Sequence, residues 1–205
     1  MDISEEKLKQ NSAQRQGDRQ QLGREDWEHA ALQMLAERGL VGLAIEPLAR
    51  RLGVTKGSFY WHFSDRRELL HAALLRWEQT DQHNLDALLS VDLPAAEKLA
   101  AFFRANSRQH RTHEVYAALI SSAGQQAEQS WVADLLNKVD KRRIDYLIRA
   151  YMELDAETAE FRARLAYYAY VGFLQMQSRG AWPINTDGGE YEPDYLDYLI
   201  NTLVK

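Results

Sequence analysis

From about residue 23 to the end of the chain, apolar residues recur at the 3.6-residue spacing of an α-helix, and no stretch alternates as a half-buried strand would. Trp27, Ala31, Met34 and Leu35 form the first stripe, and Gly39 is expected to end that helix. The same spacing predicts further helices over residues 45–52, 55–62, 65–89, 94–110, 113–124, 128–152, 156–179 and 193–204. We therefore expect an all-α fold of about nine helices.

Composition narrows the class of protein further. The 205 residues include no cysteine, which excludes disulfides, a cysteine nucleophile and thiolate metal sites. The polar N-terminus has no signal peptide, and the longest apolar run, LAYYAYVGFL at 165–174, is about half of the roughly 20 residues that span a bilayer. We expect a soluble, cytoplasmic protein with a flexible polar arm over residues 1–22.

The second and third predicted helices are joined by a three-residue turn, Leu52-Gly53-Val54, which is the arrangement of a helix-turn-helix. Gly53 fits the left-handed position that ends a helix, and Thr55 is a natural N-cap for the next one. Small or cationic residues follow Thr55, so the helix N-terminus is open to phosphate and the backbone can approach a base edge. The alternative is a purely structural helical hairpin with an aromatic core.

Charge supports the DNA-binding interpretation. Residues 48–67 carry five Lys/Arg against one Asp, although the whole chain has a net charge of −5. A basic patch on an acidic protein attracts polyanions at one place and repels them elsewhere.

The stretch from Arg24 to Leu70 resembles the DNA-binding domain of the tetracycline-repressor (TetR) family of bacterial transcription regulators. Two strings carry the resemblance: W-x-x-A-A-x-x-x-L-x-E-x-G, which begins at Trp27, and LARRLGVTKGSFYWHFSDRRELL, which ends at Leu70. Beyond residue 75 only the number and length of the helices match. The resemblance implies a three-helix DNA-binding domain over residues 23–68 and an effector-binding and dimerisation domain over 69–205.

The resemblance also implies roles for residues of the motif. The face that enters the major groove would hold Thr55, Lys56, Gly57 and Ser58. Tyr60 and His62 would contact phosphates, Arg66 or Arg67 would reach the DNA backbone, and Trp61 would lie at the DNA-facing side or its edge. Phe59 and Phe63, at helical spacing, would face the core. The sequence departs from the family at Ala44, where a Ser or Thr usually caps the second helix.

Two C-terminal helices are candidates for a dimer interface. Helix 156–179 is apolar nearly all round, and helix 193–204 carries one wide stripe: Tyr195, Leu196, Leu199, Ile200 and Leu203. The resemblance implies that both helices pair with their copies in a two-fold dimer. The alternative is that they only close the core of their own chain.

Polar residues interrupt the apolar faces of the predicted central helices, where the resemblance implies an effector pocket. Asn106 and His110 continue the stripe of Phe102 and Phe103, and Arg143 lies near the centre of another. The pocket candidates are Phe102, Phe103, Asn106, His110, Tyr116, Trp131, Arg143, Tyr167, Tyr168 and Phe173. An apolar or aromatic small molecule with one polar or anionic end would suit them, with Arg143 as partner of the charge. Internal hydrogen bonds or contacts with a dimer partner remain the alternative for each.

The sequence thus predicts a homodimeric, ligand-responsive regulator that binds a palindromic double-stranded DNA operator, most often as a repressor. Rival hypotheses are a DNA-binding protein controlled by a protein partner and a helical enzyme with a vestigial motif. No nucleophile elbow, phosphate-cradling loop or paired-carboxylate pattern favours an enzyme, and no cofactor is expected. The i, i+3 pair His110 and His113 lacks a carboxylate cluster, so we expect no metal site.

Overall fold

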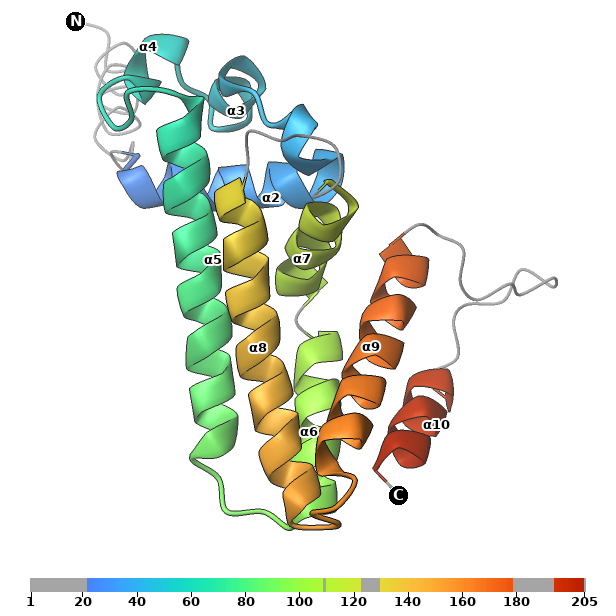
Figure 1. Ribbon diagram of the computed structural model, residues 1–205. Helices are drawn as coiled ribbons and strands as arrows, with labels where there is room; N and C mark the ends of the chain where they lie inside the picture. Colours follow the sequence, from blue (N-terminus) through green and yellow to red (C-terminus); the bar gives the residue numbers. More distant parts are fainter. Residues whose placement is uncertain (1–21, 109, 123–129, 179–193, 205) are drawn as a thin grey trace, which may run out of the picture.

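The computed structural model describes residues 22–108, 110–122, 130–178 and 194–204, and the regular elements among them are all α-helices (Figure 1). In chain order they are α2 (Arg24–Gly42), α3 (Ile45–Arg51), α4 (Lys56–Phe59), α5 (Arg66–Leu89), α6 (Ala95–Arg108), α7 (His110–Ser122), α8 (Ser130–Met152), α9 (Ala159–Ser178) and α10 (Asp194–Leu203). The all-α prediction is confirmed. The predicted boundary between α6 and α7 was a few residues late, because no glycine or proline marks it in the sequence.

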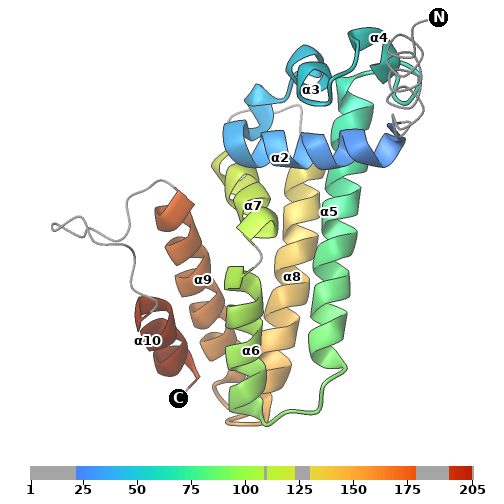
Figure 2. The same ribbon diagram turned by 180° about the vertical axis from the view of Figure 1, so that it is seen from behind.

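The helices form an elongated bundle with α2, α3 and α4 at one end. The two long helices α5 and α8 run side by side, and α6 and α7 follow one another beside them (Figures 1 and 2). α2 lies across the bundle and packs against both α5 and α7, while α9 packs on α8. The N-terminal helices are therefore held directly to α7 as well as to α5.

Two glycines with positive φ shape the N-terminal unit. Gly39 has φ 67° and ψ −175°, so the helical backbone breaks there, as predicted, before one further turn that ends at Gly42. Gly53 has φ 68° and lies in the turn between α3 and α4, which confirms its predicted left-handed conformation. A Cβ is unfavourable in this region of φ, so glycine is the residue that closes the turn at low cost.

Aromatic side chains form the centre of the N-terminal unit. Phe59 packs edge-on against Trp27 with ring centroids 5.3 Å apart and stacks on Phe63 at 5.6 Å. All three side chains are buried, together with Leu48 of α3. The short helix α4 is thus fixed by aromatic burial, since its few backbone hydrogen bonds could not hold it alone.

Hydrogen bonds to side chains fix the start of α5. Asp65 is the N-cap, and its Oδ1 accepts from the Glu68 backbone N at 2.8 Å. Glu68 Oε2 accepts from the Ser64 backbone N at 2.8 Å, so the reciprocal bond of this capping box reaches one residue further back than Asp65. Arg24 donates to Glu68 at 3.0 Å and lies over the Phe63 ring at 4.1 Å, which links the start of α2 to the start of α5.

Two apolar cores meet along α5. The first contains the aromatic centre of the N-terminal unit, Trp77 of α5, and buried residues of α7 and α8 such as Val115 and Val139. The second contains Leu85 of α5 with Phe102 and other residues of α6, α8 and α9. Because α5 contributes to both, the N-terminal unit and the rest of the bundle share one continuous helix.

The described part of the apolar stripe on α10 faces the interior. Ile200 is fully buried in the second core and Leu199 and Leu203 pack against it, whereas Tyr198, which is not part of the stripe, is exposed. This arrangement matches the alternative that α10 closes the core of its own chain; the side chains of Tyr195 and Leu196 lie outside the described residues. Among the helices that the structure describes, none has the length and apolar character needed to cross a membrane.

Glu68→Gln should lower the thermal midpoint at neutral pH, and its difference from the parent should shrink as the pH falls from about 4.5 to about 2. The backbone N–H of Ser64, its hydroxyl and Arg24 hold the pKa of Glu68 at about 2, below its ordinary 4.5. The folded state therefore binds fewer protons than the unfolded state, so this stabilisation is complete above the unfolded pKa and is lost as the pH falls through the folded one.

Thermal unfolding of both proteins between pH 2 and pH 7 measures this difference. Glu114→Gln removes an exposed carboxylate from α7 that makes none of these bonds, and it serves as the matched control. A difference between Glu68→Gln and the parent that stays constant across the range would contradict the assignment.

Candidate nucleic-acid interface and effector-binding core

The tip of the molecule consists of α3, the turn at Gly53 and α4. It lies at the N-terminal end of α5 (Figure 1). The regular part of α4 covers Lys56–Phe59 and is shorter than the predicted 55–62. After it, Trp61 N donates to Ser58 O at 3.4 Å and His62 N to Phe59 O at 2.9 Å, which are i, i+3 bonds. The chain tightens into turns here, so Tyr60 to His62 keep a helical direction without forming a regular helix.

The aromatic residues of this segment separate into an inner and an outer set. Phe59 and Phe63 are buried, as predicted. Tyr60 is 55% exposed and Trp61 is 87% exposed, although both are large aromatic side chains, and His62 is half-buried. Exposed aromatic groups at the tip are available to a partner, and their contact with DNA remains a prediction.

The residues at the start of α4 are open to solvent. Thr55 occupies the predicted N-cap position, but its side chain makes no capping hydrogen bond. Lys56 and Gly57 are exposed, whereas Ser58 is half-buried and its Oγ donates to the Thr55 carbonyl at 2.7 Å. Ala44 is the N-cap of α3 and provides no side-chain cap, in agreement with the sequence.

The two arginines at the start of α5 have different environments. Arg66 is half-buried: its Nε donates to the Leu43 carbonyl at 2.6 Å and its Nη2 donates to the Leu40 carbonyl. Arg66 therefore ties the loop after α2 to α5. Arg67 is exposed, so of the two it is the one whose charge is directed to solvent.

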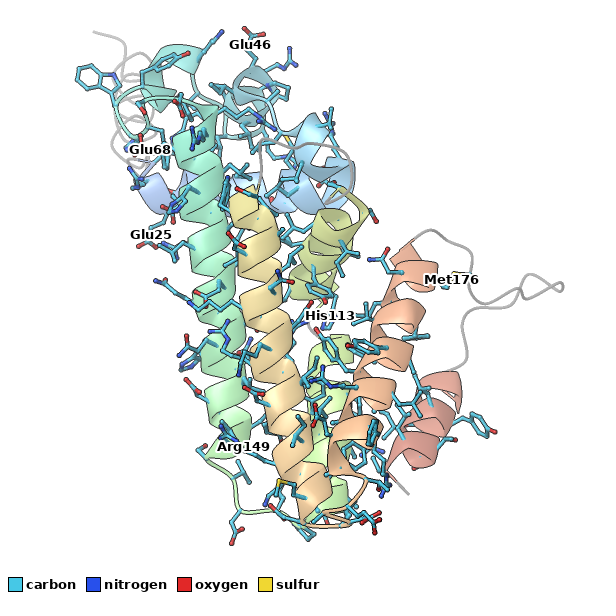
Figure 3. All side chains as sticks on the ribbon, in the orientation of Figure 1. Glu25, Glu46, Glu68, His113, Arg149 and Met176 are labelled. Carbon is cyan, nitrogen blue, oxygen red and sulfur yellow. The ribbon has the colours of Figure 1, made fainter. Side chains whose placement is uncertain are left out.

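An acidic partner of Lys56 was not anticipated from the sequence. Glu46 of α3 accepts from Lys56 Nζ at 2.9 Å, and more than half of each side chain is exposed. The Glu46 carboxylate raises the pKa of Lys56, and Figure 3 shows Glu46 at the outermost end of the tip. Glu46 lies two positions before the basic stretch 48–67, so a charge count begun slightly earlier would have included it.

A buried polar cluster connects α7, α8 and α9. Tyr116 and Tyr167 donate from their hydroxyls to Asp140 Oδ1 at 2.6 and 2.7 Å, and the two hydroxyl oxygens lie 3.0 Å apart. Burial raises the pKa of both phenols above the ordinary value, and the Asp140 carboxylate adds to this effect. Both tyrosines therefore remain hydrogen-bond donors at neutral pH.

Arg143 lies beside this cluster in a buried ion pair. Its Nε donates to Asp81 Oδ1 at 3.2 Å, its Nη2 donates to the same oxygen, and its guanidinium lies 4.9 Å from the centre of the Tyr116 ring. Burial opposes its charge, but the neighbouring Tyr167 and Asp81 raise the pKa of Arg143 above its ordinary value. The charge is thus retained and is already balanced by Asp81.

The other residues that were predicted to line an effector pocket do not all lie together. Phe102 and Phe103 are buried and pack on Tyr146 and Tyr170, with ring centroids 5.4 Å apart in each pair, and Phe173 is also buried. Trp131 is half-buried next to His71 at the start of α8, and Tyr168 is exposed on α9. The side chains of Asn106 and His110 lie outside the described residues.

Three buried or half-buried polar residues of this core were missed, namely Asp81, Asp140 and Tyr170, and His113 was considered only as half of a metal-binding pair. Asp81 interrupts an i, i+4 stripe between Trp77 and Leu85, which is the signal that singled out Arg143. His113, labelled in Figure 3, lies in the interior, where its Nδ1 is 3.3 Å from the Tyr170 hydroxyl. Among the side chains that the structure describes, no group of three or more His, Asp or Glu could hold a metal ion.

Comparison with known proteins identifies the family. Residues 29–73 match the family described as "Bacterial regulatory proteins, tetR family". The HTH-type transcriptional regulator TtgR of Pseudomonas putida is 30% identical over 162 residues, which cover 71% of this chain and 74% of that protein. The chain belongs to the tetR family of bacterial regulatory proteins.

Other relatives match over a smaller part of the chain. Tetracycline repressor protein class D of Escherichia coli is 37% identical over 91 residues, which are 44% of this chain and only 38% of that repressor. A transcriptional regulator from Rhodococcus sp. Rha1 superimposes with a TM-score of 0.70 at 23% identity, over 89% of this chain and 94% of that one. At 23% identity, this similarity shows that the two proteins share a fold.

Glu46→Gln should increase binding to duplexes of unrelated sequence and make that binding more dependent on salt. The substitution removes an anion that would face phosphates and releases Lys56, so about one further phosphate contact becomes available. Titration of a non-cognate duplex at several salt concentrations measures the slope. Asp145→Asn breaks an exposed pair with Lys141 on α8, outside the tip and its basic stretch, and is the matched control. Equal slopes for the two variants would argue against the role of Glu46.

Proposed function

We propose that the protein is a homodimeric, cytoplasmic, DNA-binding transcriptional regulator, acting as a repressor that a small molecule releases from a palindromic operator. The observation that carries this proposal is the segment from Lys56 to Trp61. Its cationic and aromatic side chains are exposed at the tip, while Phe59 within it is locked into the core. No catalytic role is proposed, since the relatives are named as regulators.

Electrostatics support binding through the tip. The five Lys/Arg of residues 48–67 lie at the end of the bundle that carries α3, α4 and the start of α5, and the remainder of the chain carries the acidic excess. A duplex would therefore approach that end and be repelled by the rest of the surface. Two copies related by a two-fold axis would place two such tips on successive major grooves.

An apolar stripe on α9 supports the dimer. Phe161, Leu165, Tyr168 and Met176 are exposed at intervals of four, three and eight residues, which places them on one face of the helix. Gly172 lies within this stripe, and a Cβ added there would meet no atom within 4 Å. A second copy could approach closely at this glycine, and burial of such a stripe is the usual driving force for association.

The packing suggests how an effector would act on DNA binding. α7 contacts α2 through the first core, and it also contributes Tyr116 to the polar cluster. A ligand that binds in the bundle and favours one position of α7 would bias the orientation of α2 and the tip. The equilibrium can shift only if the ligand binds that arrangement better than the DNA-bound one.

Lys56→Ala and Tyr60→Phe should each weaken binding to an operator selected from a random duplex pool, and Lys56→Ala should also reduce the salt slope. Loss of a phosphate or base contact costs about 1–3 kcal/mol. Electrophoretic or fluorescence titration provides the affinities. The groove assignment of α4 fails if both variants bind as tightly as the parent.

Leu165→Asp should shift the protein from dimer toward monomer at micromolar concentration and weaken operator binding in parallel. Sedimentation equilibrium and DNA titration provide the two readouts. Leu75→Asp places the same charge at an exposed leucine of α5 outside the α9 stripe and should leave the mass unchanged. A parent protein that is monomeric under these conditions would exclude the proposed dimer.

A further inference from the structure

The buried ion pair between Asp81 of α5 and Arg143 of α8 leaves one polar atom of each side chain without a hydrogen bond in the described part of the chain. Asp81 and Arg143 are 5% and 2% exposed, and Asp81 Oδ1 accepts both donated bonds from the guanidinium. Asp81 Oδ2 and Arg143 Nη1 are buried and have no hydrogen-bond partner among the described residues. Polar atoms in this state are costly, so a group that satisfies both would bind favourably.

Both residues line a small hollow between α5, α6 and α8, which we call the inner hollow. Its volume is about 10 Å³, and its other walls are the apolar side chains of Leu85, Leu88, Phe102 and Ala105 and the polar side chain of Asn84. A space of this size admits roughly one water-sized group. The inner hollow can therefore accept the tip of a ligand but not a bulky head.

A larger groove leads to the inner hollow from the surface. This outer groove has a volume of about 480 Å³ and is lined by Leu88, Leu93, three alanines of α6 and the charged residues Glu97 and Arg104. Leu88 and Ala105 line both spaces, so the outer groove and the inner hollow adjoin. An apolar body could lie in the outer groove while its polar end reached the ion pair.

The two unsatisfied atoms define the chemistry of that polar end. Arg143 Nη1 requires an acceptor and Asp81 Oδ2 requires a donor, and one water-sized group must provide both. A hydroxyl does so, whereas an ether oxygen cannot donate and a carboxylate would present lone pairs to Asp81. An anionic end, which the sequence suggested for Arg143, is disfavoured because Asp81 already balances the guanidinium.

We propose that the inner hollow is a hydroxyl-recognition site, and that the effector is a neutral molecule with an apolar body and one alcohol or phenol group. The hydroxyl accepts from Arg143 Nη1 and donates to Asp81 Oδ2, and the body lies along Leu88 and Ala105. The ligand then bridges α5, α6 and α8. The effect of this ligand on DNA binding rests on the proposed function, whereas binding of the ligand to the inner hollow does not depend on it.

Three probes of nearly equal size test the assignment on the purified protein without DNA: 1-octanol, its isomer heptyl methyl ether, and octanoate. Titration calorimetry and thermal shift should show 1-octanol binding about tenfold or more tightly than the other two, because each of these leaves a buried polar atom unsatisfied or opposed. A crystal structure with 1-octanol should place its oxygen between Asp81 and Arg143.

Three variants test which residues are responsible for the order of affinities. Asp81→Asn leaves the guanidinium without a carboxylate, so octanoate should now bind more tightly than 1-octanol. Asp145→Asn removes the same charge from an exposed pair on α8 and should keep the parent order of affinities. If Asp81→Asn does not fold, Ala105→Leu decides instead, since it narrows the passage and should abolish 1-octanol binding without touching the ion pair.

The outcomes separate the two proposals. Equal binding of 1-octanol and the ether, tighter binding of octanoate to the parent, or 1-octanol bound only elsewhere overturns the hydroxyl site. If 1-octanol binds as expected but does not lower affinity for the selected operator, the effector role fails and the site stands. Absence of any selected operator overturns the proposed function alone.

Discussion

The structure depends on the continuity of α5. One inward stripe of this helix packs in the first core at Leu70 and Trp77 and in the second at Leu85. The Trp77 indole N–H also donates to the Thr112 carbonyl at 3.1 Å, which links α5 to the start of α7. Because α5 belongs to both the first and the second core, the tip cannot reorient without a change in how α5 and α7 pack on α2. Packed interfaces tend to move between discrete arrangements, and that property suits a two-state regulator.

The protein uses ion pairs in two different settings. The pair of Lys56 and Glu46 is exposed, so water and salt screen it and its net contribution to stability is small. A partner at the tip can exchange it for new contacts at little cost. The pair of Asp81 and Arg143 is buried, and loss of either member would leave an uncompensated charge inside the bundle. The first pair is suited to competition with a polyanion, and the second to specific recognition by hydrogen bonds.

Several features could be predicted because they depend on neighbours in sequence. The left-handed conformation of Gly53 and the N-cap position of Thr55 follow from local backbone chemistry, and the structure confirms them. The inward direction of Phe59 and Phe63 follows from helical spacing. Tyr168 could not be placed in this way, because α9 is apolar nearly all round and periodicity selects no inner face. Its neighbour Tyr167 lies about 100° away on the helix and is buried.

The helical class, the order of the helices and the exposed segment from Lys56 to Trp61 could be predicted from the sequence, because they depend on spacing, turn chemistry and a local motif. Which charged groups meet depends on how the helices pack. Asp81 and Arg143 are 62 positions apart, and Tyr116 reaches Asp140 and Tyr167 across three helices. Partners on different helices are set by how the helices pack, and no local pattern encodes that packing. The chemistry of the proposed ligand site therefore appears only in the folded molecule.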